Sequence, residues 1–429
     1  MSKKTRGVVA FAVLCGLSLF LLNCGSTVNR SSGLLYVLIQ GSNNISSYSI
    51  DLTSGNLSLI NSNASTCASA TTSCGFALDI ILDPTGANAF VLNQGSFNSA
   101  SAGNPVAPSI YGYKVNSDGS LAAGADVSAS AFTAGDLAVA MARDAAGKFL
   151  FVITHGLTPA PTTCNATPAP AGCPQLYVFS TQTASTSLSL ASQISLSRIP
   201  TGIAAIAGPN SNLLLYVTSN TDLVTGRNDD NTLSEYSVDG SGKLTEYTDP
   251  NTGLPYTTPG NPSAVLAVTT MPIGGTGQTF VYVASVTANS VSAYQLCTVQ
   301  SANCAAPDVA SFRLLPVVGS SPNAGSDPVA MVADPTSQFL FVVSQNSSQL
   351  FGFRINGSQG TLSALNPANM STGSLPIALA MHSTGKFLFV SNNGSSNISS
   401  FNVDTTSGAL SSPITVTTSN AQPAGLVSR

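Results

Sequence analysis

The 429-residue chain has no tryptophan, two histidines and few charged side chains, which make up only 7% of its residues. Its formal net charge is −4, and no basic stripe is present that would neutralise a phosphate backbone, so we expect no nucleic-acid partner. After the N-terminal region, no stretch shows a sustained helical period of apolar residues. The residues that remain abundant are Ser, Thr, Asn and Gly, which predict a hydroxylated and nearly neutral surface.

One segment of sequence is repeated along the chain, and its clearest copies run from Asp334 to Leu365 and from His382 to Ser412. Each copy reads as three short strands, because β-branched and aromatic residues are bounded by clusters of Gly, Asn, Asp and Ser. A short apolar run opened by proline, such as PVAMVA from Pro328, precedes each copy and supplies a fourth strand. We name the four strands a, b, c and d in chain order.

Strand b recurs seven times, and the chain begins with strands b, c and d but ends with a lone strand a at 424–429. If this last strand pairs beside residues 34–40, the two ends complete one blade and the ring closes without a free edge. The sequence therefore predicts an all-β fold over residues 34–429, a seven-bladed β-propeller of four-stranded antiparallel blades. A helical solenoid is the competing repeat architecture, but it needs apolar spacings of three and four residues. The aromatic anchors of strand b are Tyr36, Phe90, Phe151, Tyr216, Tyr282, Phe341 and Phe389.

Residues 1–23 have the layout of a signal peptide, because three basic residues precede an apolar run over 8–22. Cys24 resembles the lipidated cysteine of bacterial lipoproteins, although Asn23 differs from the small residue that usually precedes it. We therefore expect residues 24–33 to tether an exported propeller, by a lipid, to a membrane of the cell envelope that faces the periplasm or the exterior. A cleaved signal with an incidental Cys24 is one alternative. An uncleaved anchor is another, although the apolar run is short for a membrane span.

Beyond Cys15 and Cys24, the six remaining cysteines fall into three pairs of near neighbours, each in a loop insertion rich in Ala, Ser, Thr and Pro. The pairs are Cys67 with Cys74, Cys164 with Cys173, and Cys297 with Cys304. Three local disulfides are the simplest interpretation, although six cysteines formally allow other pairings. Paired zinc ligands are closer together than these, so we expect no metal site here. Disulfides favour an oxidising compartment and hence export.

The turn before strand b and strand b itself, as in DPTGANAFVLNQG, DAAGKFLFVITHG and HSTGKFLFVSNNG, resemble the lactonase family of seven-bladed propellers. That family is related to 6-phosphogluconolactonase and to muconate-cyclising propeller enzymes, and the resemblance covers about residues 34–429. It is specific for the architecture and much less so for the chemistry, because related repeats occur in exported propellers that only bind. Family enzymes use histidine, arginine and glutamate near the mouth of the central channel, and no local motif carries those positions onto this chain.

Three residues are nevertheless candidates for a catalytic site, because propeller topology brings them to the top face, which the d-to-a and b-to-c connections form. His155 ends a strand b, Arg198 precedes the next strand a, and Arg227 lies in the following b-to-c connection with Asp229 and Asp230. An imidazole there is able to activate water against a lactone carbonyl, with an arginine stabilising the oxyanion. The alternative is a polar loop histidine beside solvated charge pairs of little energetic weight.

The acidic residues of TDLVTGRNDDN, residues 221–231, also offer oxygen ligands to calcium, but they lack the alternating spacing of a dedicated calcium loop. No GxSxG, HExxH or phosphate-binding glycine loop rises above background, so we expect no cofactor.

Two functions from different classes fit these observations. The first is an exported, lipid-anchored binding or scaffold module, whose top-face loops present a surface to a carbohydrate or peptide. Loops that vary in length on a repeated frame are typical of such a surface. The second is a lactone hydrolase of the 6-phosphogluconolactonase-like lactonase family, with His155 and the nearby arginines acting on a small lactone at the channel mouth.

Overall fold

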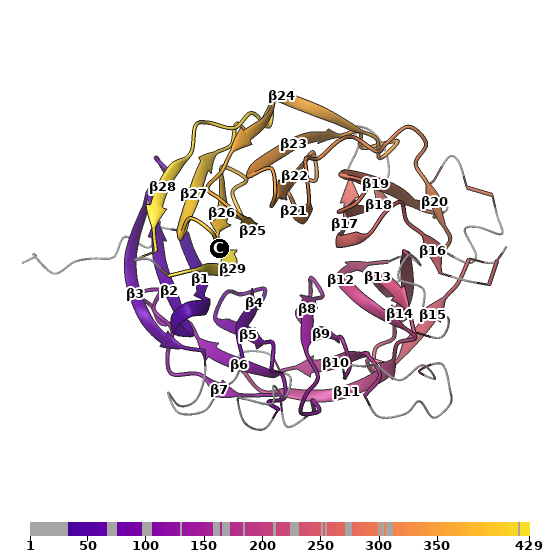
Figure 1. Cartoon of the computed structure of the whole chain (residues 1–429), viewed down its shortest axis with the longest axis horizontal. Coiled ribbons are helices and arrows are strands. Elements are labelled where there is room, and N and C mark those ends of the chain that lie inside the picture. The colour runs from indigo at the N-terminus through magenta and orange to yellow at the C-terminus, as the bar shows by residue number, and fades with distance from the viewer. Residues whose placement is uncertain are drawn as a thin grey trace, which may run out of the picture. The chain divides into compact units, whose positions relative to one another are not determined.

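Seven antiparallel sheets are arranged around a central axis, six of them with four strands and one with five (Figure 1). This confirms the predicted seven-bladed propeller. The computed structural model describes residues 33–66, 75–96, 105–128, 131–157, 164, 172–182, 185–208, 212–223, 231–249, 252–253, 255–270, 277–298, 301, 304–305, 312–418 and 421–429. These residues contain no helix that is both long and apolar enough to cross a membrane.

Strand a of each blade is innermost and strand d outermost. In blade order, the a strands are β29 (Pro423–Ser428), β4 (Ala77–Leu82), β8 (Ala138–Arg143), β12 (Arg198–Ala207), β17 (Pro262–Thr270), β21 (Pro328–Ala333) and β25 (Pro376–Met381). The b strands are β1 (Gly33–Ile39), β5 (Asn88–Asn93), β9 (Phe149–Thr154), β13 (Leu213–Asp222), β18 (Gln278–Ser285), β22 (Phe339–Ser344) and β26 (Phe387–Asn392).

The c strands are β2 (Asn44–Ile50), β6 (Ser109–Lys114), β10 (Gln175–Thr181), β14 (Thr232–Val238), β19 (Ser290–Leu296), β23 (Gln349–Ile355) and β27 (Asn397–Asn402). The d strands are β3 (Leu57–Ser65), β7 (Ala125–Asp126), β11 (Leu188–Ser195), β15 (Leu244–Tyr247), β20 (Leu314–Pro316), β24 (Leu362–Ser371) and β28 (Ile414–Thr417). A short extra strand, β16 (Tyr256–Thr257), pairs with β14, and a single 3-10 turn, η1 (Gln40–Ser42), follows β1.

The two ends of the propeller share one sheet, as the incomplete last repeat predicts. Strand β29 pairs antiparallel with β1, with Val37 opposite Leu426. At the end of this ladder, the Leu34 amide donates to the Arg429 carbonyl at 3.0 Å, and the Arg429 amide donates back at 2.9 Å. Strand β1 therefore has a partner on both sides, which removes the free edge that an open ring would expose.

The blades pack through the aromatic anchors of strand b, all of which are buried. Two tyrosines among them also hold the next blade. Tyr36 donates its hydroxyl to the Gly119 carbonyl at 2.9 Å, and Tyr282 donates to the Gly360 carbonyl at 3.0 Å. Both glycines lie in c-to-d turns with a positive φ, and a Cβ on Gly360 would lie 2.3 Å from the Phe280 ring. Only glycine permits both that conformation and that approach.

Cationic side chains also join neighbouring blades on the bottom face, which the a-to-b and c-to-d turns form. Lys148 donates to the Gly240 carbonyl of the next blade at 2.6 Å, and Arg354 donates to the Thr406 carbonyl at 3.1 Å. His382 lies in a turn on this face, as predicted, beside Gly33 of β1 and Arg429, the residue after β29. Burial lowers the pKa of His382 below its usual 6.5. This histidine therefore supports the closed ring and is remote from the top face.

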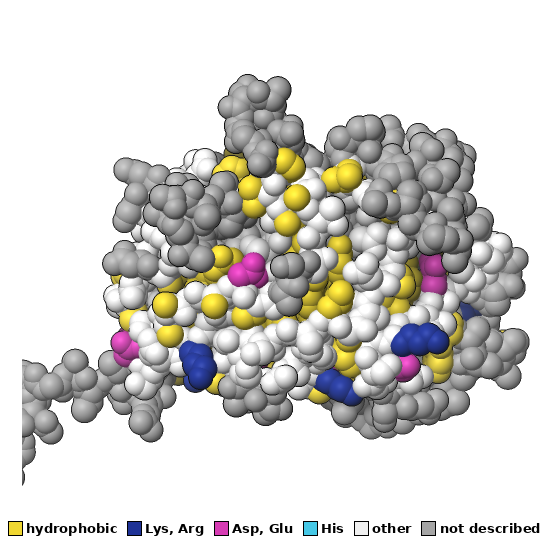
Figure 2. Space-filling view, turned by 90° about the horizontal axis from the view of Figure 1, so that it is seen from below, with side chains coloured by type: hydrophobic (Ala, Val, Ile, Leu, Met, Phe, Trp, Pro, Cys, Tyr) yellow, Lys and Arg dark blue, Asp and Glu magenta, His cyan; other side chains and the backbone are white. Residues whose placement is uncertain are grey.

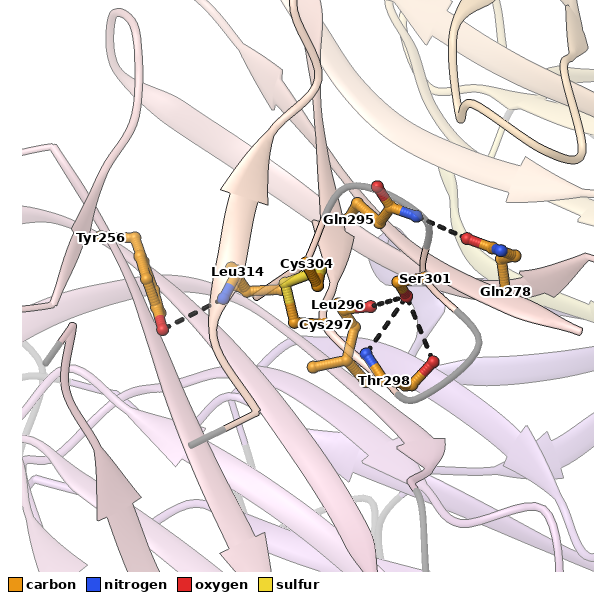
Figure 3. Close-up of a disulfide and its surroundings, with 9 residues drawn as sticks. All are labelled: Tyr256, Gln278, Gln295, Leu296, Cys297, Thr298, Ser301, Cys304 and Leu314. Carbon is orange, nitrogen blue, oxygen red and sulfur yellow. Dashed lines mark hydrogen bonds between the residues drawn. A yellow bond between two sulfur atoms is a disulfide. The ribbon is translucent and has the colours of Figure 1, made fainter. Parts of the chain in front are cut away.

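Two of the three predicted disulfides are present, Cys164–Cys173 and Cys297–Cys304. Cys67 and Cys74 lie outside the described residues. The second disulfide lies in the c-to-d connection of the fifth blade, beside the end of β19 (Figure 3). There the Ser301 hydroxyl donates to the Leu296 carbonyl at 3.1 Å, and the Tyr256 hydroxyl accepts from the Leu314 amide at 3.1 Å. A cross-linked loop thus stands where other blades have a short turn.

Candidate functional site

A pocket of about 330 Å³ opens on the top side of the third blade. The d-to-a connection before β8, the b-to-c connection after β9 and the strands β10 and β11 surround it. We call it the blade-3 pocket. Its volume is at the lower end of the range for small-molecule sites. The polar residues that line it are Thr133, Asp136, Gln175, Tyr177, Gln193 and Ser195.

Asp136 provides the charged wall of this pocket and is 3% exposed. Its Oδ1 accepts hydrogen bonds from the Leu137 amide at 2.8 Å and from the Gly156 amide at 2.7 Å. The carboxyl group thereby ties the start of strand a to the loop that follows strand b. Burial raises the pKa of Asp136, and hydrogen bonds from Thr154 and from the backbone oppose that rise. A carboxyl with a raised pKa exchanges protons at a higher pH than an ordinary aspartate does.

His155 lies beside Asp136 on the top face, where the sequence predicts it. Its backbone amide donates to the Leu137 carbonyl at 2.8 Å, which fixes the residue directly after β9. The side chain is half-buried, and its Nδ1 atom has no hydrogen-bond partner among the described residues. The positive form of His155 favours the ionised form of Asp136.

Tyr177 and Gln175 extend from β10 to the same pocket. The Tyr177 ring meets Phe132 edge to face, with 4.9 Å between centroids, so its orientation is fixed. Burial and the nearby charge of Asp136 raise the pKa of Tyr177, which therefore stays protonated and available as a donor. The Gln175 Nε2 atom donates to the Ser195 hydroxyl at 2.8 Å and to the Cys173 carbonyl at 3.2 Å, so this side chain is also held in place.

The Cys164–Cys173 disulfide builds another wall of the pocket, which Cys173 lines. Both sulfur-bearing residues are buried and pack against Leu223 and Ile199 of the next blade. The Leu157 amide donates to the Gly172 carbonyl at 2.8 Å, which closes the loop on itself. The disulfide thus fixes the b-to-c connection of the third blade against the fourth.

Arg198 lies in a strand and not in the predicted loop. It is the first residue of β12 and not part of the connection before it, because strand a continues past Pro200 through two register shifts. There it lies opposite Asp222, with 3.5 Å between Nη2 and Oδ2 and with both side chains largely buried. Asp222, one of the acids considered for calcium, is thus an ion-pair partner. Arg227, with Asp229 and Asp230, lies outside the described residues.

Asp136 and Tyr177 are functional candidates that the sequence did not predict. Asp136 belongs to GDLAVAMAR, directly before strand a, and its only signal is that position in a top-face connection. Tyr177 follows the pattern of a core aromatic in strand c, and nothing in that pattern shows that the ring reaches a pocket.

Comparisons with known proteins agree with this fold. Residues 275–422, which span β18 to β28, match the family model described as Lactonase, 7-bladed beta-propeller. The periplasmic gluconolactonase of Pseudomonas aeruginosa superposes with a TM-score of 0.64 at 18% identity, covering 92% of this chain and 98% of that one. A putative 6-phosphogluconolactonase from Bacteroides fragilis gives a TM-score of 0.61 at 13% identity, covering 94% and 99%. A protein from Lactobacillus plantarum gives 0.63 at 13%, covering 93% and 99%.

No curated protein matches the chain in sequence. At the identities found, the structural likenesses establish the fold alone, and the sequence match over 275–422 connects the last three blades with one family. The chain is thus a seven-bladed propeller whose residues 275–422 match the lactonase family model, and the predicted resemblance to that family is confirmed.

Proposed function

We propose that the protein hydrolyses a sugar lactone in the blade-3 pocket. The observation that carries this proposal is that a buried carboxyl group, Asp136, and a tyrosine whose ring is held by Phe132, Tyr177, line one pocket of the top face. The match to the lactonase family model supports it, as does the fold shared with a periplasmic gluconolactonase. These likenesses favour hydrolysis over a purely binding or scaffold role.

In this proposal, Asp136 acts as the general base. It takes a proton from water as the water oxygen attacks the lactone carbonyl, while the Tyr177 hydroxyl donates a hydrogen bond to the developing oxyanion. The ring C–O bond then breaks, and protonated Asp136 returns the proton to the leaving alkoxide, which gives the open-chain hydroxy acid. The positive form of His155 favours the ionised form of Asp136, so His155 acts on the reaction through Asp136 and does not touch the substrate. Arg198 has no catalytic role in this scheme, because its charge is balanced by Asp222.

Turnover of aldonolactones by the purified protein, measured against the uncatalysed rate, tests the proposal. We expect kcat/KM to fall as the pH decreases, because the base must be ionised. The raised pKa of Asp136 places this loss above the usual range of an aspartate. Absence of turnover on every lactone in the panel would contradict hydrolysis. Sugar binding without turnover would support the binding module instead.

We also propose that the propeller is exported and held at the cell envelope by a lipid on Cys24. The apolar run over 8–22 supports export, and so do the two disulfides, since such bonds are typical of oxidising compartments. A Cys24→Ala variant should move from the membrane fraction to the soluble fraction of cells. Cys15→Ala, which changes a cysteine inside the apolar run, is the matched control and should stay with the membrane. Equal membrane association of both variants would refute lipidation at Cys24.

A further inference from the structure

The two faces of the propeller differ in charge. Among the described residues, every lysine and arginine except Arg198 lies in a turn or at a strand end of the bottom face. On the side of the molecule that Figure 2 shows, the dark-blue groups accordingly lie along the lower half. Several are already bonded to backbone carbonyls of a neighbouring blade, as Lys148 and Arg354 are. Within the described residues, the top face, where the pocket opens, is therefore poor in positive charge.

The blade-3 pocket itself has one charged residue in its described lining, the carboxylate of Asp136. The two connections that line it, residues 127–137 and 155–174, have no lysine or arginine in their sequences. The guanidinium of Arg198 on the adjacent blade is engaged by Asp222 at 3.5 Å. Proteins bind phosphate groups with arginine or lysine clusters, or with converging backbone amides at a helix N-terminus. The described part of the pocket offers neither.

The remaining polar groups suit hydroxyl groups instead. Gln175, Gln193, Thr133 and Ser195 provide amides and hydroxyls, which donate to and accept from neutral sugar hydroxyls. A phosphate dianion placed among them would face the Asp136 carboxylate, and like charges at short range repel strongly in a partly buried site.

From these observations we infer that the blade-3 pocket takes an uncharged, polyhydroxylated lactone and rejects the phosphorylated form of the same sugar. This inference rests on the lactone hydrolysis proposed above and names its substrate class. It distinguishes between two activities that the names of similar structures suggest, a gluconolactonase and a 6-phosphogluconolactonase.

The direct test compares kcat/KM for glucono-1,5-lactone and for its 6-phosphate at one pH and ionic strength, with the uncatalysed rate subtracted. We expect a preference of at least about 100-fold for the neutral lactone. Each of the two negative charges of the phosphate is repelled by the Asp136 carboxylate, and each repulsion is expected to lower kcat/KM about tenfold. Equal or faster turnover of the phosphorylated lactone would overturn the inference and leave lactone hydrolysis standing. No turnover of either lactone would overturn both.

A variant with an added positive charge provides a second test, which compares a ratio of kcat/KM values and does not depend on the absolute turnover rates. Gln193 is exposed at the rim of the pocket on β11, so a Gln193→Lys variant adds a cation there. We expect the ratio of kcat/KM for phosphorylated over neutral lactone to rise about tenfold. Gln182→Lys is the matched control, because Gln182 is an exposed glutamine of the same blade on the bottom face. The inference fails if the two variants change this ratio equally.

Discussion

Replacing Asp136 by asparagine should lower kcat for lactone hydrolysis at least about 100-fold, the usual contribution of a general base, while the propeller stays folded. Asparagine has nearly the same shape, and its side-chain oxygen is still able to accept the Leu137 and Gly156 amides that bond to Asp136 Oδ1. It cannot take a proton from water. The fold and the pocket wall should therefore persist while the chemistry is lost, as thermal unfolding and steady-state kinetics of the same preparation will show.

Asp144→Asn is the matched control for this substitution. Asp144 is also buried, and its Oδ1 accepts the Phe149 amide at 2.7 Å, but it lies in a turn of the bottom face. The variant has the same change of charge and the same change of shape, and we expect it to keep the wild-type kcat. A kcat for Asp136→Asn within a few-fold of wild type would remove Asp136 from the mechanism. Equal losses in both variants would point to a general structural effect.

Replacing Leu426 by aspartate should lower the free energy of unfolding by at least about 3 kcal/mol, because it buries an unpaired charge and deletes an apolar contact. Leu426 lies in the middle of β29, opposite Val37 of β1, and is 7% exposed. Its side chain belongs to the apolar cluster that joins the first and last blades. Loss of this contact loosens the strand that closes the ring, so the expected effect is larger than that of an ordinary core substitution.

Thr415→Asp provides the comparison for the closing strand. Thr415 is exposed on β28, the outermost strand of the last blade, so its replacement should change the unfolding free energy by no more than about 0.5 kcal/mol. Urea unfolding of both variants, followed by far-UV circular dichroism, measures the difference. If Leu426→Asp is as stable as Thr415→Asp, the pairing of β29 with β1 does not hold the ring together.

The fold was predictable because its evidence is local and repeated. Each strand b presents an aromatic residue between two turns, and a chain that ends on a lone strand a needs strands b, c and d from its beginning. Pairing of the two ends then follows from counting. The long first strand of the fourth blade was not predictable, because the register shifts around Pro200 that carry β12 back to Arg198 depend on the partner strand.

The candidate site was predictable only in part. The propeller topology predicts His155 on the top face, and in the structure His155 lies on that face beside Asp136. The importance of Asp136 arises from contacts between connections that are distant in sequence, since one of its hydrogen bonds comes from Gly156. Arg198 was a candidate for the catalytic site, but its ion pair with Asp222 on the next strand was not predictable, because sequence spacing alone does not show that pairing.

A crystal structure with the δ-lactam analogue of gluconolactone, which has the shape of the substrate but resists hydrolysis, tests the location of the site directly. We expect the lactam in the blade-3 pocket, with its carbonyl oxygen within about 3 Å of the Tyr177 hydroxyl and its carbonyl carbon facing the Asp136 carboxylate across a water. A lactam bound in the central channel, with the blade-3 pocket free of ligand, would contradict the proposed site.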